Sequence, residues 1–301
     1  MSTPAIAQSL WIPMVEQNLF DPLLEKIRGA LRDDSAFANG DTVVIPNAGA
    51  ATQITVNRDS YPAAIAKRKD EPVSYNIKNI EADPILLQWA ENQEINYNKA
   101  ESILLDAIDG LGQRAGLEIL RGLYASDTDY SITTTGSAVA AHAPGATGNR
   151  KSLSAYDLMK AAEVMDRNNI KGERFAFLDT VSYHQVLKEL GFTANRLSEI
   201  ESLNLNLPTI YSFNLIQIAS PIPVQSNKTL RDVGSAGGTT DQVMNLCVSR
   251  PHTSYVIDGI YAPVTEDAAS FGWIYSAAIR AGSKYRRTDK KGIVPIIQAN
   301  A

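Results

Sequence analysis

The stretch from Asn96 to Tyr124, NYNKAESILLDAIDGLGQRAGLEILRGLY, constrains the fold of this chain more than any other segment. Its apolar residues recur at helical spacing and form one stripe, made of Ala100, Leu104, Ala107, Ile108, Leu111, Ala115 and Ile119. A helix of about 29 residues is roughly 43 Å long. A compact chain of 301 residues has a radius of gyration of only about 19 Å. The helix must therefore cross nearly the whole molecule, and its apolar face carries no catalytic group, so the pattern predicts a structural strut.

The composition is that of an ordinary folded protein, with 44% hydrophobic and 20% charged residues. A net charge of -5 argues against a dedicated nucleic-acid binder, whose surface is usually strongly basic. Cys247 is the only cysteine, so no intrachain disulfide can form, which fits a reducing compartment. The sequence shows neither a secretory signal nor the run of about 18 apolar residues that a membrane span needs. We therefore expect a protein made in a cytoplasm, with no membrane contact.

Residues 41–90 have the pattern of an extended arm. The segments GDTVVIPNAGAATQITVNR and PVSYNIKNIEAD are partly alternating, and a polar, charged stretch separates them. In the second segment, Val73, Tyr75 and Ile77 share one face of a strand. A two-stranded arm by itself is marginally stable at best in water. We therefore expect a hairpin whose apolar face is covered by a neighbouring subunit.

The rest of the chain mixes helices with strands. Helical spacing predicts helices within 15–31, where Pro22 would kink or divide the helix, and within 153–168 and 182–190. Strands are predicted for RFAFLD, NLIQIASPIPV, VMNLCVSR, SYVIDG, GWIYSAAIRAGSKYRR and IVPIIQ. The predicted class is α+β, with an extended arm, a hairpin and a long helix attached to a mixed core.

No motif in the chain predicts chemistry. Gly110, Gly112 and Gly116 lie inside the predicted helix, and their spacing is not the GxGxxG that a dinucleotide site needs directly after a strand. We interpret them as positions of close helix packing or of local weakness. Cys247 and the three histidines are not spaced as zinc ligands. The sequence therefore predicts that the protein is not an enzyme, with no catalytic, cofactor-binding or metal-binding residues and no cofactor.

Two basic clusters and one aromatic residue are candidates for contact with another subunit. One cluster lies at the expected hairpin tip, the other lies near the C-terminus, and the aromatic residue is isolated in an N-terminal stretch without periodicity. Each cluster is either a solvated surface or a set of intersubunit ion pairs. In chain order the candidates are Trp11, Lys67, Arg68, Lys69, Arg286, Arg287, Lys290 and Lys291.

Several segments in a fixed order carry a resemblance to a known family. They are the arm around WIPMVEQNLF, the run GDTVVIP, the hairpin region, ENQEINYNKAESILLDAIDGLGQRAGLEIL, LMKAAEVMDRNNIKGERFAFLDTVSYHQVL, NLIQIASPIPV and RRTDKKGIVPI. Their joint pattern resembles the major capsid proteins of tailed bacteriophages, which have the Hong Kong 97 fold. The resemblance covers nearly the whole chain. It rests on the order of these segments and on their residue patterns, because no single motif is diagnostic.

The resemblance implies a layout for the chain. An N-terminal arm occupies 1–40 and an extended β-hairpin loop occupies 41–95. A peripheral domain combines 96–180 with 263–301 and contains a spine helix at about 96–125, and an axial domain occupies 181–262. The core-facing residues of the spine helix would be Leu104, Ile108, Leu111, Ala115 and Ile119.

The resemblance also implies a function. The chain would be a structural protein that self-assembles into the pentamers and hexamers of an icosahedral phage head. The head would enclose double-stranded DNA without sequence-specific binding. Further partners would be portal, separate scaffold and decoration proteins. The subunit would be assembled in the host bacterial cytoplasm and reside in the virion capsid.

Two alternatives remain open from the sequence. An encapsulin-type nanocompartment shell shares the same fold and encloses enzymes instead of DNA. A soluble α+β enzyme would need a concave pocket with convergent polar groups, for which the sequence offers no candidate set.

Overall fold

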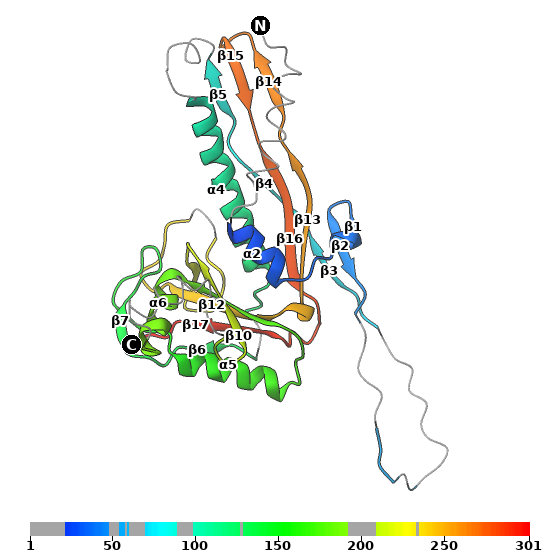
Figure 1. Cartoon of the computed structure of the whole chain (residues 1–301), viewed down its shortest axis with the longest axis vertical. Coiled ribbons are helices and arrows are strands. Elements are labelled where there is room, and N and C mark those ends of the chain that lie inside the picture. Colours follow the sequence, from blue (N-terminus) through cyan, green and yellow to red (C-terminus); the bar gives the residue numbers. More distant parts are fainter. Residues whose placement is uncertain are drawn as a thin grey trace, which may run out of the picture.

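The chain is built around the long helix that the sequence predicts. The computed structural model describes residues 22–47, 54–57, 59, 70–88, 99–126, 129–191, 209–232 and 235–301. Helix α4 spans Lys99–Gly122, within the predicted 96–125, and its 24 residues make it roughly 36 Å long. Figure 1 shows α4 running beside the strands of an elongated part of the molecule.

Two three-stranded antiparallel sheets lie beside α4 and continue one another. The first has the order β13-β16-β4, and the second has the order β14-β15-β5. Each strand of the first sheet is joined by a short connection to its counterpart in the second, so the sheets follow the same path (Figure 1). The strands are β13 (Thr253–Tyr261), β16 (Ala278–Tyr285), β4 (Lys78–Glu81), β14 (Val264–Asp267), β15 (Gly272–Tyr275) and β5 (Ile85–Gln88). We call α4 and these six strands the long region.

A second part, the compact lobe, is built on a six-stranded sheet with the order β10-β9-β12-β17-β6, to which β11 adds by pairing with β12. Strands β9 and β10 are parallel, whereas β12 is antiparallel to both β9 and β17. Every residue of the central strand β12 is buried, including the polar residues Gln242, Asn245 and Ser249, so the strand does not alternate between a buried and an exposed face. The strands are β6 (Ile132–Thr133), β9 (Arg174–Asp179), β10 (Phe213–Ile218), β11 (Ile222–Val224), β12 (Gln242–Ser249) and β17 (Ile293–Ile297).

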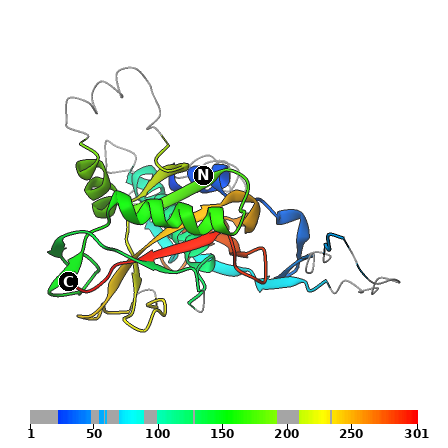
Figure 2. The ribbon, with the colours of Figure 1, turned by 90° about the horizontal axis from the view of Figure 1, so that it is seen from below.

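Two helices pack on the sheet of the compact lobe, and each begins at a capping residue. Helix α5 (Ala155–Arg167) lies across the sheet in Figure 2. Ser154 and Asp157 form a reciprocal capping box at its start. Helix α6 (Thr180–Glu189) follows β9 directly, and Asp179 accepts hydrogen bonds from the first backbone N–H groups of that helix. These caps explain where the two predicted helices begin. The lobe also carries a small hairpin of β7 (Ala138–Ala140) and β8 (Asn149–Lys151).

The apolar stripe of α4 is buried, as the sequence predicts. Ile108, Leu111, Ala115 and Ile119 are each at most 5% exposed. The side chain of Leu104, the fifth predicted member, lies outside the part of the chain that the structure describes. The stripe therefore forms part of the main hydrophobic core.

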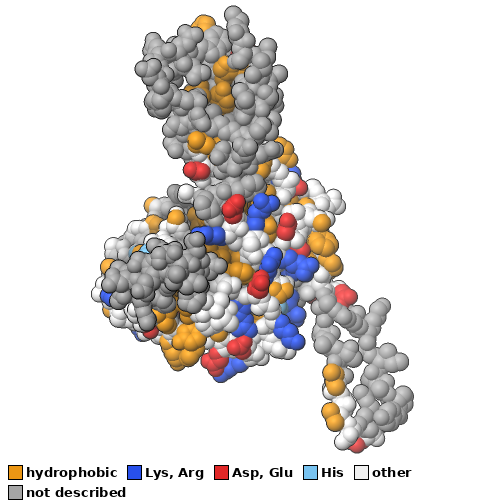
Figure 3. Space-filling model, viewed as in Figure 1, with side chains coloured by type: hydrophobic (Ala, Val, Ile, Leu, Met, Phe, Trp, Pro, Cys, Tyr) orange, Lys and Arg blue, Asp and Glu red, His pale blue; other side chains and the backbone are white. Residues whose placement is uncertain are grey.

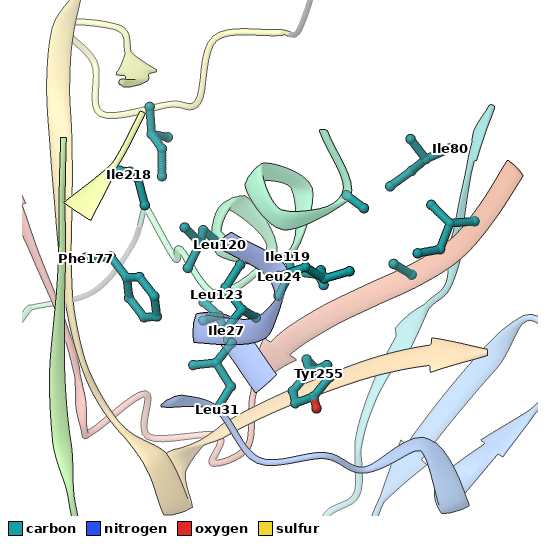
Figure 4. Close-up of a cluster of buried hydrophobic side chains, with 14 of the residues drawn as sticks. Leu24, Ile27, Leu31, Ile80, Ile119, Leu120, Leu123, Phe177, Ile218 and Tyr255 are labelled. Carbon is teal, nitrogen blue, oxygen red and sulfur yellow. The ribbon is translucent and has the colours of Figure 1, made fainter. Parts of the chain in front are cut away.

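Helix α2 (Pro22–Ala30) packs across α4 and closes this core. Its first residue is proline, which suits the first helical position because no intrahelical N–H is needed there. Residues 15–21, the rest of the predicted helix, lie outside the described part. In Figure 4 the side chains of α2 meet those of α4, while others reach in from β9 and β10. The cluster joins the long region to the compact lobe; among its members are Leu24, Ile27, Leu31, Ile119, Leu120, Leu123, Phe177 and Ile218.

The structure contains the base of the predicted hairpin. Strand β2 (Thr42–Ile45) pairs antiparallel with β3 (Val73–Asn76), and β1 (Ala38–Asn39) completes a three-stranded sheet. The inward side chains of β3 are buried, as their alternation predicts. At the root, β13 of the same chain packs on this apolar face, where the sequence led us to expect a neighbouring subunit. Most of the segment between β2 and β3, including the predicted tip at 67–69, lies outside the described residues.

Strand pairing crosses the boundaries of the predicted layout in three places. Strands β4 and β5 lie within the predicted loop at 41–95, yet they pair with β16 and β15. Strands β9 and β17 fall in the predicted peripheral domain but pair with β12 of the predicted axial domain. Strand β13, predicted to be axial, pairs with β16 of the long region. Sequence patterns specify which face of a strand is buried, but its partner is chosen by segments far away in the chain. The division into peripheral and axial domains otherwise stays a prediction.

Helix α4 approaches its neighbours most closely at two glycines. A Cβ atom at Gly116 would lie 3.0 Å from Leu23 Cδ2 of α2, and one at Gly122 would lie 2.6 Å from the backbone oxygen of Ser283 in β16. A Cβ atom at Gly110 would meet nothing within 4 Å. The first two glycines therefore fit the interpretation of close packing, and Gly110 fits that of local weakness.

We predict opposite effects for Gly110→Ala and Gly122→Ala, although both add one methyl group to the same helix. Gly110→Ala should stabilise the subunit by about 0.5–1 kcal/mol, because alanine is the better helix former and its methyl group meets no neighbour. Gly122→Ala should destabilise it by about 1–3 kcal/mol, because the methyl group overlaps the backbone of β16. Thermal unfolding measures both effects. Equal shifts in melting temperature would contradict the close approach of α4 to β16.

Candidate functional site

The root of the hairpin has a small hydrophobic core of its own. Apolar side chains of β2 and β3 pack there against the long strand β13. The Tyr75 hydroxyl lies 2.8 Å from Ser254 Oγ, which gives this core one buried hydrogen bond. Burial raises the pKa of Tyr75 well above its ordinary value, so the hydroxyl stays protonated. The members are Val43, Ile45, Tyr75, Ile77 and Val256.

Polar contacts from β16 also hold the hairpin. Arg280 forms an ion pair with Asp41, which lies in the turn before β2. Its other terminal nitrogen, Nη1, lies 2.9 Å from Asp258 Oδ2, at the β-bulge where the pairing of β13 with β16 shifts. Lys284 Nζ donates a hydrogen bond of 2.9 Å to the backbone oxygen of Ser74 in β3. One strand of the long region therefore holds both strands of the hairpin.

A buried carboxylate links three distant segments beside this root. Asp34 is 2% exposed, and its side-chain oxygens lie 3.4 Å from Arg32 Nε and 3.3 Å from Arg286 Nε. Its backbone N–H donates to the carbonyl of Tyr255 at 3.0 Å. Asp34 therefore ties the segment after α2 to β13 and to the segment before β17. A buried charge of this kind needs its partners, since an unpaired one is strongly destabilising.

The C-terminal basic cluster predicted from the sequence lies next to Asp34. Arg286 is the cation that pairs with this carboxylate. Arg287 Nη2 lies 2.7 Å from Asp289 Oδ2, and Lys291 Nζ lies 3.9 Å from the same oxygen. Burial opposes the effect, but the hydrogen bond from Arg287 holds the pKa of Asp289 below its ordinary value. The cluster is thus partly neutralised within the chain.

The same face of the molecule is rich in basic side chains. Figure 3 shows Lys and Arg gathered between the compact lobe and the hairpin. Lys290 Nζ lies 5.6 Å from the centre of the Tyr285 ring, within the range of a cation–π contact. Burial, with a contribution from the nearby Arg287, lowers the pKa of His252, so this imidazole is neutral at pH 7.

A second ionic cluster lies on α4 near its C-terminal end. Glu118 Oε2 lies 3.0 Å from Lys78 Nζ of β4, and Oε1 lies 3.4 Å from Arg114 Nη2 and 3.3 Å from Arg121 Nε. Three cationic side chains therefore surround one carboxylate, and the contact with Lys78 joins α4 to β4. The four groups together carry a net positive charge.

No sequence pattern identifies Asp34, Arg280 or Glu118 as site residues, because each has an ion-pair partner on a distant segment of the chain. Arg280 and Asp41 are 239 positions apart in the chain. No signal in a single sequence could have paired such residues, because the fold alone brings them together.

The described residues offer no arrangement that resembles an active site. Among them no group of three or more His, Cys, Asp or Glu side chains could hold a metal ion. Cys247 is fully buried, and burial raises the pKa of its thiol far above the ordinary value, so it is not a ready nucleophile. His142 Nε2 lies 3.1 Å from Asp179 Oδ2, but its other ring nitrogen faces Gln298 Nε2 at 3.4 Å and not a serine hydroxyl. The His–Asp pair is therefore a structural contact.

Three solved structures of shell proteins share this architecture. The capsid of cyanophage P-SCSP1u matches with a TM-score of 0.61 at 13% identity, over 90% of this chain and 87% of that chain. The capsid of Ralstonia phage GP4 matches with a TM-score of 0.61 at 12% identity, over the same shares of 90% and 87%. A virus-like particle from Pyrococcus furiosus matches with a TM-score of 0.53 at 11% identity, over 94% of this chain and 96% of that chain.

The chain has the Hong Kong 97 capsid fold. This confirms the fold predicted from the order of the sequence segments and their residue patterns. At identities this low the likeness establishes the fold and not the function. No protein-family model and no curated protein sequence matches the chain. Within the part of the chain that the structure describes, no helix is both long and apolar enough to cross a membrane.

The structure describes only four of the eight residues that the sequence predicts as contacts with another subunit. Arg286, Arg287, Lys290 and Lys291 lie together beside the hairpin root, with the intrachain contacts given above. The other candidates, Trp11, Lys67, Arg68 and Lys69, lie outside the described residues. The intersubunit role of all eight stays a prediction.

We predict that Arg286→Met destabilises the subunit by about 3 kcal/mol, because it removes a principal partner of the buried Asp34 carboxylate. Arg287→Met is the matched control. Its pair with Asp289 is half exposed and worth less than about 1 kcal/mol. The double variant Arg286→Met/Asp34→Leu should recover most of the loss, since it removes both charges. Urea unfolding gives the three free energies. Equal losses for the two single variants would contradict the role of Asp34 as a buried ionic junction.

We also predict an acid-sensitive contribution from Asp179. Burial would raise the pKa of this carboxyl, but hydrogen bonds from His142 and Ser182 outweigh burial and hold the pKa below the ordinary value of 3.8. A group with a lowered pKa in the folded state stabilises the protein above its unfolded-state pKa. That stabilisation is lost as the pH falls towards the folded-state pKa. The stability difference between wild type and Asp179→Asn should therefore be largest above about pH 4 and shrink below it. Thermal unfolding from pH 3 to pH 6 measures this stability difference, and a difference that stays constant over that range would contradict the prediction.

Proposed function

We propose that this chain is a structural major capsid protein that self-assembles into the pentamers and hexamers of an icosahedral phage head. The observation that carries the proposal is the extent of the fold likeness, which spans 90% of this chain and 87% of a phage capsid chain. An overlap of this extent leaves about a tenth of this chain outside the shared architecture.

The distribution of charged groups supports a structural role. Asp34, Arg280 and Glu118 each tie together elements that are distant in the chain, and none of them lines a pocket with a nucleophile or a metal-ligand set among the described residues. Such ion pairs fix the relative position of elements, which is what a subunit in a repeated lattice requires. The soluble-enzyme alternative lacks a comparable set of convergent groups within the described part.

The shape of the subunit supports assembly. The base of the hairpin is held by a small core, and a two-stranded arm by itself is marginally stable at best in water. In the proposed shell, a neighbouring subunit covers the hairpin. Further contacts come from the predicted basic and aromatic candidates: Trp11, Lys67, Arg68, Lys69, Arg286, Arg287, Lys290 and Lys291. Exposed ion pairs are individually worth less than about 1 kcal/mol. A shell repeats each of them many times.

The proposed shell encloses double-stranded DNA without reading its sequence, in keeping with a net charge of -5. Its further partners are a portal, a separate scaffold and decoration proteins. The subunit is assembled in the cytoplasm of a host bacterium and resides in the virion.

An encapsulin-type nanocompartment is the second candidate, and the likeness to a virus-like particle from Pyrococcus furiosus is the observation that supports it. Its TM-score of 0.53 gives it no advantage over the phage capsids at 0.61.

We predict that the purified chain forms pentamers, hexamers or closed shells at micromolar concentration. The physical reason is that apolar side chains beyond the buried hairpin root are exposed in the single subunit, with Ile54 90% and Val56 82% exposed. Sedimentation velocity measures the size distribution, and negative-stain microscopy shows whether shells form. Nucleic acid inside particles recovered from a host that also supplies a packaging system would favour the phage head, whereas a protein cargo would favour the nanocompartment. A stable monomer that resists proteolysis within 41–90 would refute both.

A further inference from the structure

A pocket lies between helix α4 and the part of the compact lobe around β11. Its volume is about 260 Å³, near the lower end of the range of about 300–1,000 Å³ that is usual for ligand pockets. One wall comes from α4, and the other comes from β11, the turn between β7 and β8, and the segment 231–237. A pocket of this size suits a small molecule. Its principal lining residues are Arg114, Leu117, Arg121, Ile222, Arg231 and Asp232.

Three arginine side chains line the pocket from two segments that are far apart in the chain. Arg114 and Arg121 belong to α4, and Arg231 follows β11. Arg121 Nη2 donates a hydrogen bond of 2.6 Å to the backbone oxygen of Arg231, so the two segments meet there. Arg231 Nε and Nη2 donate to the two side-chain oxygens of the buried Asp241, at 2.8 and 2.5 Å. A guanidinium group has five N–H donors, so these contacts leave donors on each arginine for a further acceptor.

The pocket is short of negative charge. The carboxylate of Glu118 is shared by three cations, two of which, Arg114 and Arg121, line the pocket. Asp232 is the one carboxylate in the described lining, and it is exposed to solvent. The side chain of Arg121 is only 12% exposed, and burial lowers the pKa of its guanidinium, with a contribution from Arg114. The attraction of Glu118 and Asp232 does not offset this shift. An additional anion beside Arg121 would therefore be stabilised.

The rest of the lining is mainly apolar and firmly held. Leu117 of α4 and Ile222 of β11 contribute to it, together with three prolines. A Cβ atom at Gly237 would overlap the backbone oxygen of Pro144, so two segments of the wall are in close backbone contact. The pocket is thus formed before a ligand enters, which lowers the entropic cost of binding. The prolines are Pro144, Pro221 and Pro223.

We propose that this pocket binds a small phosphate monoester, with the phosphate group facing the three arginines and the organic group lying against the apolar wall. Guanidinium groups match the geometry of phosphate oxygens and bind them through paired hydrogen bonds. A phosphate monoester carries a charge of about −1.5 to −2 at pH 7, which suits several cations better than a single negative charge does.

The site is suited to binding and not to cleavage of the ester. Its described lining contains no histidine or cysteine, and the Ser235 hydroxyl donates to the carbonyl of Asp232. A bound ligand would contact both α4 and the compact lobe, so its binding strengthens the junction between the long region and the lobe. This ligand site goes beyond the proposed capsid function and does not depend on self-assembly.

Isothermal titration calorimetry of the full-length chain with phenyl phosphate tests the site. The wild type should bind phenyl phosphate, and its affinity should fall as the salt concentration rises. Inorganic phosphate lacks the organic group and benzoate carries a single charge, so each should bind at least about tenfold more weakly. Phenol, which has no charge at pH 7, should show no binding.

Two pocket variants and one control locate the binding. Arg114→Gln should weaken the binding of phenyl phosphate at least about tenfold, because it removes a charged donor. Arg167→Gln is the matched control, since both arginines form an ion pair with a glutamate four residues away, but Arg167 lies on α5 and outside the lining. It should bind as the wild type does. Ser220→Trp keeps the three arginines and fills the pocket from an exposed lining position, so it should also weaken binding at least about tenfold. Thermal unfolding verifies that each variant is folded.

The outcomes separate this site from the proposed function. Binding that both pocket variants weaken and the control leaves unchanged supports the site. No binding of phenyl phosphate at millimolar concentration, or an affinity that either folded pocket variant leaves unchanged, overturns it. Equal affinity for inorganic phosphate overturns the role of the apolar wall, and equal affinity for benzoate overturns the phosphate class. A chain that binds phenyl phosphate but stays monomeric contradicts the capsid function and leaves the site intact.

Discussion

The packing of α4 against β16 and α2 is the contact on which the rest of the structure depends. Gly122 lets the helix approach the backbone of Ser283 more closely than a residue with a Cβ atom could, and Gly116 allows tight packing against the side chain of Leu23. Close approach lets the apolar stripe of α4 bury itself between the long sheet and α2. The same core takes in side chains from β9 and β10, so one hydrophobic cluster joins the long region to the compact lobe (Figure 4).

Ionic contacts then decide the position of the parts that this core does not cover. The base of the hairpin buries few side chains, and such a small core fixes orientation poorly. Arg280 and Lys284 hold its two strands from one side, and Asp34 ties the preceding segment to β13 and to Arg286. Buried and half-buried charges are demanding contacts, because losing one partner leaves the other unpaired. They therefore favour a single orientation of the hairpin root.

Much of the architecture was predictable because it depends on local periodicity. The helical stripe at 96–124 and the alternation in β3 each follow from the spacing of apolar residues in one short segment. The basic candidates could be found as clusters of charge, but their partners could not. Arg286 meets Asp34 and Arg287 meets Asp289 for reasons that only the chain path supplies.

The sequence by itself determined the α+β class, the long helix, the base of the hairpin and the order of the elements, because each is encoded in neighbouring residues. Only the tertiary structure decided that β4 and β5 belong to the two sheets of the long region, that β9, β12 and β17 share one sheet, and that Arg280 pairs with both Asp41 and Asp258. Strand pairing and charge placement are set by contacts between segments up to hundreds of residues apart. The free energy of those contacts depends on the whole fold, so no local pattern carries it.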